Sequence, residues 1–157
     1  MSNQGVRGYY QITQTIKDQL LADENVNTVT TGDITEIDLS KQTIFPLSHI
    51  IINNVTIQEQ VLNFNISVLA MDLVNLSKEE TTDIFRGNNN EQDVINTQLA
   101  VVNRLVGALR QGTIHLDLYQ LDGNASCEFF YDRFENDMAG VTCTFNVLIA
   151  NDINLCN

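Results

Sequence analysis

The sequence has no tryptophan, a single proline (Pro46) and only 8 lysines and arginines among 157 residues. The basic residues are scattered along the chain, whereas proteins that bind a phosphate backbone cluster Lys and Arg to displace its counterions. Sequence-specific DNA binding is therefore disfavoured. Because the chain also lacks a Pro/Ser-rich linker, its length predicts one domain over residues 1–157.

Long hydrophobic runs are absent too. No apolar run approaches the roughly 20 residues that a membrane-spanning helix needs, and residues 1–8 lack the apolar stretch of a signal peptide. The 3 cysteines, Cys127, Cys143 and Cys156, are widely spaced, which fits neither a disulfide framework nor a zinc site. These absences predict no membrane partner and a reducing compartment.

Residues typical of catalysis are few and isolated. His49 and His115 lie in strand-like runs outside any metal-ligand spacing, so a structural role is predicted for both. Cys127 and Cys143 occupy positions that the pattern places inward, as small apolar core residues. Calcium-loop and phosphate-binding glycine motifs are missing. The sequence predicts no metal and no cofactor.

One carboxylate group leaves a hydrolase hypothesis open. Asp132, Glu135 and Asp137 flank Arg133 at a strand end. Hydrolases place such carboxylates in a cleft where one acid has a raised pKa, and no pattern here marks that acid. The main prediction is therefore a protein that is not an enzyme and has no catalytic residue.

What the chain does have is acidity and a regular alternation of elements. Its 20 acidic residues give a net charge of −12. This charge has two interpretations: solubility through like-charge repulsion, or a surface that DNA passes without adhering.

Apolar periodicity predicts two amphipathic helices. Tyr9, Ile12, Ile16 and Leu20 recur at steps of three and four residues and indicate a helix over about residues 9–22. A second helix is predicted over residues 91–110, where Gly112 follows the last apolar position. Residues 26–39 are interpreted as a loop or a weak edge strand that leads into the sheet.

Period-two alternation predicts an antiparallel sheet. The runs at 47–55 and 62–70 should form a long hairpin linked near residues 56–60, with its alternating apolar residues buried and Asn63, Asn65 and Ser67 on the other face.

The C-terminal third of the chain predicts a meander of three strands at residues 113–120, 126–134 and 141–149. Its first hairpin turn falls at Asp122-Gly123-Asn124. In the middle strand, Cys127, Phe129 and Tyr131 alternate with Glu128, Phe130 and Asp132. The expected fold is α+β, a long hairpin plus this meander packed against two helices.

Several polar residues are candidates for a subunit or partner interface. The polar loop at 75–90 is long and has no predicted helix or strand, which is typical of a functional or a mobile segment. An Arg133 side chain beside an aromatic residue suits a bidentate contact with a neighbour's carboxylate, and a surface ion pair is the alternative. The candidate residues are Asn63, Asn65, Ser67, Glu79, Glu80, Asp83, Arg86, Asp132, Arg133, Glu135 and Asn136.

The order of elements resembles the tail terminator and tail completion (head–tail joining) proteins of tailed bacteriophages. The likeness runs from Tyr10-Gln11-Ile12 through the strand 61–71 and the helix 94–109 to the strands that end at Ile149. The strings at 131–136 and 145–149 are also similar to those of virion proteins from marine and gut phages. The resemblance to the tail terminator family covers nearly the whole chain and lies in the order of the elements.

The resemblance implies a virion structural protein of the tail or neck, assembled in the host cytoplasm. It implies a homo-oligomeric ring, commonly hexameric, that ends the tail tube and joins it to the head–tail connector or stopper protein. Genomic DNA would pass through the lumen without specific binding, and the ring would close through a heterologous contact between copies. The strand pair at 47–73 and the loop at 75–90 are the parts expected to reach neighbouring copies, since an edge strand can extend a neighbour's sheet through backbone hydrogen bonds.

Fold alone does not fix the role, so other functions stay open. One alternative is another neck or connector ring of the same fold, including one from a short-tailed phage. A second is a non-virion assembly chaperone or binding module. The third is the hydrolase considered above.

Overall fold

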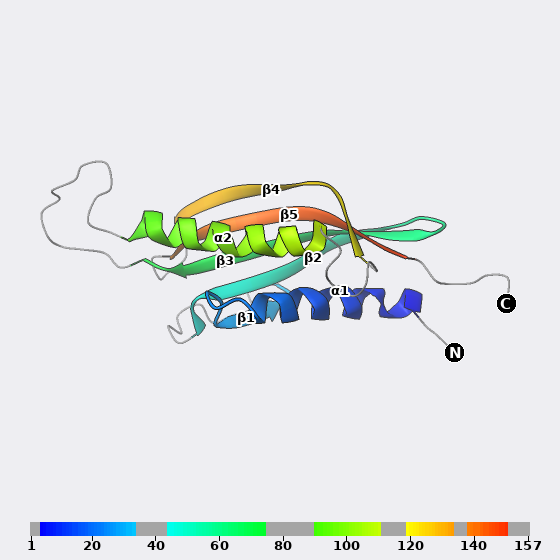
Figure 1. The fold of residues 1–157 in the computed structure, drawn as a ribbon, viewed down its shortest axis with the longest axis horizontal. Helices are drawn as coiled ribbons and strands as arrows, with labels where there is room; N and C mark the ends of the chain where they lie inside the picture. Colours follow the sequence, from blue (N-terminus) through cyan, green and yellow to red (C-terminus); the bar gives the residue numbers. More distant parts are fainter. Residues whose placement is uncertain (1–3, 34–43, 75–89, 111–118, 134–137, 151–157) are drawn as a thin grey trace, which may run out of the picture.

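Two helices cover one face of a five-stranded sheet in the computed structural model, which describes residues 4–33, 44–74, 90–110, 119–133 and 138–150 (Figure 1). The elements are α1 (Gln4–Leu21), β1 (Thr28–Thr31), β2 (Leu47–Ile57), β3 (Val61–Leu73), α2 (Glu91–Arg110), β4 (Tyr119–Arg133) and β5 (Met138–Ala150). The strand order is β1-β2-β3-β5-β4. The predicted α+β class with two helices is confirmed.

The sheet is mixed and mostly antiparallel, which corrects the prediction of a wholly antiparallel sheet. β1 pairs with β2 in parallel over Leu47–Ile50, and the other pairings are antiparallel. The backbone N–H groups of Asn27 and Thr28 donate to the carbonyl of Pro46, which sets this parallel start. The segment interpreted as a loop or weak edge strand is therefore an edge strand over four residues.

The predicted three-strand meander is wrong in its first turn. The structure has one strand, β4, that continues through Asp122-Gly123-Asn124. Gly123 has a positive φ of 73°, and the register with β5 shifts between Asp122 and Ser126. The turn-forming residues are accommodated as an irregularity because β5 runs uninterrupted beside them. The predicted strand at 113–120 lies outside the described residues except for its end in β4, and His115 lies outside them too.

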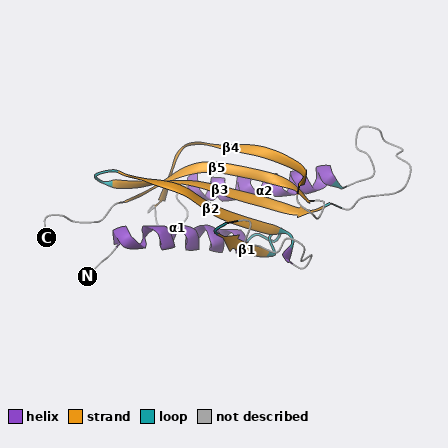
Figure 2. Ribbon diagram, turned by 180° about the vertical axis from the view of Figure 1, so that it is seen from behind, coloured by secondary structure: helices purple, strands orange, loops and turns teal. Residues whose placement is uncertain are grey.

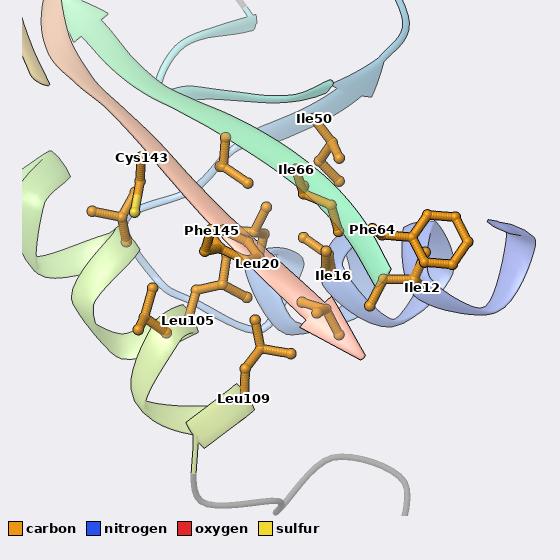
Figure 3. Packing of buried hydrophobic residues seen from close by; sticks show 14 of the residues in the cluster. Ile12, Ile16, Leu20, Ile50, Phe64, Ile66, Leu105, Leu109, Cys143 and Phe145 are labelled. Carbon is orange, nitrogen blue, oxygen red and sulfur yellow. The ribbon is translucent and has the colours of Figure 1, made fainter. Parts of the chain in front are cut away.

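One hydrophobic core lies between the sheet and both helices. Ile12, Ile16 and Leu20 of α1 meet the even-numbered residues of β3 from Leu62 to Ala70, all of them buried. α2 contributes Val101, Val102, Leu105, Val106 and Leu109, and β5 contributes Val141, Cys143, Phe145, Val147 and Ile149 (Figure 3). The predicted register of β3 is confirmed, since every even-numbered position from Leu62 to Ala70 belongs to this core.

His49 joins the edge strand β1 to β2, which confirms its predicted structural role. Its ring is buried, and its Nε2 lies 2.8 Å from the carbonyl oxygen of Gly32 while its Nδ1 lies 2.7 Å from the Thr30 hydroxyl. A carbonyl only accepts, so Nε2–H donates to Gly32 and Nδ1 accepts from Thr30 in the neutral ring. Burial lowers the pKa of His49, against the opposing effects of Gly32 and Asp33, so the neutral form is favoured.

An ion pair joins the end of α1 to α2. Arg104 donates from Nε to Asp23 Oδ2 at 2.7 Å and from Nη2 to Asp23 Oδ1 at 2.9 Å. Burial acts to raise the pKa of Asp23, but the hydrogen bonds from Arg104 and from the Asn25 backbone, with the charge of Arg104, outweigh it and lower the pKa below 3.8. The carboxylate is therefore favoured in the folded state.

We expect Arg104→Ala to lower the free energy of unfolding by about 1 kcal/mol at neutral pH, because half of the Arg104 side chain is exposed and solvent weakens such pairs. A lowered carboxylate pKa stabilises the fold above the unfolded-state pKa, and this contribution is lost as pH falls through the folded-state pKa. Urea unfolding of both proteins should therefore give a difference that shrinks as pH falls below the ordinary aspartate pKa. Burial raises the pKa of Asp72, which acts in the opposite direction, so only the difference between the two proteins isolates the ion pair. A difference that does not depend on pH would contradict this account.

Candidate interaction surface

The face of the sheet opposite the helices, which is turned toward the viewer in Figure 2, carries a row of polar side chains joined by hydrogen bonds. Alternation along β3 places Asn63, Asn65 and Ser67 on this face, between β2 and β5. A register shift between Ile52 and Asn54 marks a bulge in β2, next to which Asn53 reaches two of them. We call this set the polar ladder; its members are Asn53, Asn63, Asn65, Ser67, Asp122, Thr144 and Asn146.

Hydrogen bonds of the polar ladder cross the sheet from strand to strand. The Asn53 amide donates to Asn65 Oδ1 at 2.8 Å and to Ser67 Oγ at 2.9 Å. Asn65 donates in turn to Asn146 Oδ1 at 3.1 Å. The hydroxyls of Ser67 and Thr144 lie 3.0 Å apart, and Asn63 donates to Asp122 Oδ2 at 3.2 Å. The side chains are thus held in fixed orientations by one another.

The structure brings together three of the predicted interface residues, Asn63, Asn65 and Ser67. Asn63 and Asn65 are half-buried and Ser67 is buried, so these side chains meet partners within their own chain. Asn63 Oδ1 is buried without a hydrogen-bond partner among the residues that the structure describes. That oxygen can accept a further hydrogen bond. The contact of these residues with a neighbour stays a prediction.

An apolar cluster occupies the other end of the same face. Phe45, Leu47, Met71, Phe130 and Met138 are all buried there. The ring of Phe130 lies over Gly140, where an added Cβ would come within 2.9 Å of it and within 2.1 Å of the Ala70 carbonyl oxygen. Glycine at this position lets the aromatic ring close over the strands.

The faces of β4 differ from the prediction. Cys127, which the pattern placed inward, is exposed, as are Phe129 and Tyr131, whereas Phe130 is buried on the opposite face. Cys143 is buried as predicted. The difference arises because β4 is the edge strand: the two faces of its backbone alternate as expected, but α2 covers the helix-side face of β5 more fully than that of β4.

The outer end of the β2–β3 hairpin, residues 53–60, is exposed throughout and projects past α2 and β4 at the right of Figure 1. Val55 is 42% exposed and Ile57 is 74% exposed, and both lie on the helix-side face beside Phe64 and Leu62. β1 covers the outer edge of β2 only over Leu47–Ile50. Within the described ranges, the edge of β2 from Ile51 to Ile57 therefore has no strand partner.

Two tyrosines of α1 lie at the same end of the molecule. Gly8 packs against the side chains of Leu62 and Phe64, which brings the start of α1 over the hairpin. The adjacent Tyr9 and Tyr10 are 47% and 73% exposed, with their rings 6.0 Å apart in an edge-to-face arrangement. We call Tyr9, Tyr10, Val55 and Ile57 the hairpin-end surface.

The sequence analysis expects the strand pair at 47–73 to reach neighbouring copies, but it does not name the side chains of the hairpin-end surface, because it ends the first strand at residue 55. The β-branched run Val55-Thr56-Ile57 was the available signal for a longer strand. Tyr9 was assigned to the apolar side of the helix, yet nearly half of its surface is exposed. Exposed aromatic and β-branched side chains next to a free sheet edge suit contact with another polypeptide.

The other predicted interface residues fall outside what the structure describes. Glu79, Glu80, Asp83 and Arg86 belong to the segment 75–89, and Glu135 and Asn136 to the segment 134–137. For Asp132 and Arg133 the structure describes the backbone at the end of β4, where Arg133 is the register partner of Met138. The bidentate Arg133 contact and the Asp132, Glu135 and Asp137 hydrolase hypothesis stay predictions.

A groove of about 590 Å³ runs between α2 and the strands β4 and β5. Leu99, Ala100 and Val106 form its helix side, and Ala125, Cys127 and Cys143 line its strand side. Nowhere in the described ranges do three or more His, Cys, Asp or Glu side chains come close enough to hold a metal ion. No helix among these residues has the length and hydropathy needed to cross a membrane.

Comparison with known proteins gives no match: no protein-family model matches the chain, and neither does any curated protein.

Proposed function

We propose that this chain is a structural subunit of a tailed-phage virion that assembles into a ring, commonly of six copies in the family it resembles. The ring ends the tail tube and joins it to the head–tail connector. The finer fold assignment, a tail-terminator-like domain, belongs to the same proposal. It is supported by the element order of the sequence and by a surface suited to self-association.

The observation that carries this proposal is the hairpin-end surface beside an open strand edge. Single exposed apolar side chains are normal on a protein surface. Here Val55 and Ile57 share one face of β2, and the outer edge of the same residues is open among the described strands. Backbone donors and acceptors on that edge accept a strand from another chain, while the apolar side chains add buried area.

The net charge of −12 agrees with the proposed DNA conduit. A negatively charged lumen does not bind the phosphate groups of DNA, so the duplex slides through without adhering. Asp122 and Glu128 are exposed on the face of β4 away from the helices, and Glu59 is exposed at the hairpin turn. A solubility role accounts for the charge equally well, so the charge is secondary support.

The oligomeric state tests the proposal. Native mass spectrometry of the full chain should give one closed assembly whose mass is a whole multiple of 17.6 kDa. Negative-stain microscopy should show a ring with a central hole, and a gel-shift assay at moderate salt should show no DNA complex. A chain that stays monomeric at high concentration, and is missing from mature particles, would instead be an assembly chaperone.

A further inference from the structure

Two cysteines face each other across the neighbouring strands β4 and β5. Cys127 and Cys143 are direct register partners in the antiparallel pairing. Both side chains line the groove under α2. Cys127 is exposed and Cys143 is buried, so one thiol meets solvent and the other lies directly behind it.

This placement meets the geometric requirement of a disulfide. Residues directly opposite on antiparallel strands have Cα atoms about 4.5–5.5 Å apart. Disulfides join residues whose Cα atoms are about 4.4–6.8 Å apart and whose Cβ vectors point the same way. Side chains of register partners share one face of the sheet, and here both point into the groove. The pairing therefore places the two sulfur atoms where a bond between them can form.

We propose that Cys127 and Cys143 form a reversible intrachain disulfide that fastens the edge strand β4 to β5 beneath α2. The oxidant is a small disulfide of the glutathione class. The Cys127 thiolate attacks one sulfur atom of this oxidant, which forms a mixed disulfide and releases one small thiol. Cys143, after loss of its proton, attacks the Cys127 sulfur and expels the second small thiol. Two protein thiols are oxidised, and one small disulfide is reduced to two thiols.

The two steps have different rates because the two thiols differ in environment. Cys127 reacts first, since Cys127 is exposed and Cys143 is buried. Burial, with the hydrogen bond and charge of Cys127, raises the pKa of Cys143 to about 12. The second attack needs the thiolate, so ring closure should speed up as pH rises through the weakly alkaline range. Once Cys127 carries the mixed disulfide it has no negative charge, so it no longer opposes formation of the Cys143 thiolate.

The bond would act on the least regular strand of the sheet. The register of β4 with β5 shifts between Asp122 and Ser126 and again between Phe130 and Arg133. Cys127 lies in the short regular run between these shifts, which forms the strand side of the groove. A disulfide there fixes that run against β5 and restricts the unfolded chain. Oxidation thus stiffens the groove, whether or not the chain assembles into a ring.

The test uses the full chain carrying Cys156→Ser, so that Cys127 and Cys143 are its only thiols. After treatment with oxidised glutathione, the thiol count should fall from two to zero and the intact mass should decrease by two hydrogens. Non-reducing peptide mapping should link the Cys127 and Cys143 peptides within one chain. The melting temperature should rise by about 5–10 °C and return after addition of dithiothreitol.

Matched variants separate the two steps. In the Cys156→Ser background, Cys143→Ala should stop at a mixed disulfide on Cys127, and Cys127→Ser should leave the buried Cys143 reduced. Neither variant should show the rise in melting temperature on oxidation. Persistence of glutathione on Cys127 in the chain that keeps both thiols, or a disulfide between chains, would overturn the proposal. Peptide mapping detects the Cys127–Cys143 disulfide within one chain, so its outcome does not depend on whether the ring assembles.

Discussion

Replacement of Phe145 by alanine should lower the free energy of unfolding by about 3–5 kcal/mol. Phe145 is 1% exposed and lies at the centre of β5, opposite Ile66 of β3. In Figure 3 it lies among the side chains of both helices, near Leu20 of α1 and Leu105 of α2. Its truncation leaves a cavity where the two helices and the sheet meet. The free energy of unfolding of a domain is only about 5–15 kcal/mol, so this loss is a large part of the total stability.

Phe129 provides a matched control for this prediction. It is the same residue type on the neighbouring strand β4 and is 45% exposed, so Phe129→Ala should cost less than about 1 kcal/mol. Urea unfolding followed by circular dichroism measures both variants. Equal losses for the two phenylalanines would mean that the core does not lie between this face of the sheet and the helices.

The helices were predictable because their signals are local. The apolar spacing, with Gly112 after the last apolar position, predicts a helix at residues 91–110, and α2 has these bounds. The helix α1 begins at Gln4, earlier than the predicted start near Tyr9. Gly5 and Gly8 are poor helix formers, which made this first part unlikely by propensity. Gly8 is favoured by a tertiary contact instead, since it lets α1 approach Leu62 and Phe64 closely.

The sheet was predictable in its alternation and less so in its pairing. Period two places Asn63, Asn65 and Ser67 on one face, yet nothing local reveals that Asn65 bonds Asn146, 81 positions away. The composition of Asp122-Gly123-Asn124 suits a hairpin turn and an irregular strand equally well. The strand is formed because β4 pairs with β5 on both sides of this segment. The parallel strand β1 spans four residues, too short for a periodic pattern.

The candidate surface was predictable in the same uneven way. Polar residues that alternate with buried ones are visible in the sequence, so the polar ladder was found in part. Its remaining members come from β2, β4 and β5 and depend on the pairing of the strands. The hairpin was expected to reach neighbours, but its exposed apolar side chains were not identified, because the exposure of an apolar residue depends on which other elements cover it. The sequence pattern of a β-branched strand residue is the same whether its side chain is buried or exposed.

Substitution of Ile57 by aspartate should weaken the proposed self-assembly strongly while leaving the subunit folded. Ile57 is 74% exposed, so the change should alter the free energy of unfolding by no more than about 0.5 kcal/mol. In an assembly that covers this residue, an unpaired carboxylate loses its hydration, which costs about 2–3 kcal/mol or more. The dissociation constant should then rise about 30- to 150-fold, as measured by sedimentation or mass photometry over a dilution series.

Thr56→Asp is the control for charge, because Thr56 is the exposed neighbour on the opposite face of the same strand. It adds the same negative charge to an already acidic chain, so any general repulsion between subunits is equal in the two variants. Adding Val55→Asp to Ile57→Asp should weaken assembly further, since both side chains lie on one face of β2. If Thr56→Asp and Ile57→Asp weaken assembly equally, repulsion explains the effect and the apolar side chains of the hairpin are not the contact. If neither has an effect on an assembly that does form, the copies meet elsewhere, and the polar ladder becomes the next surface to test.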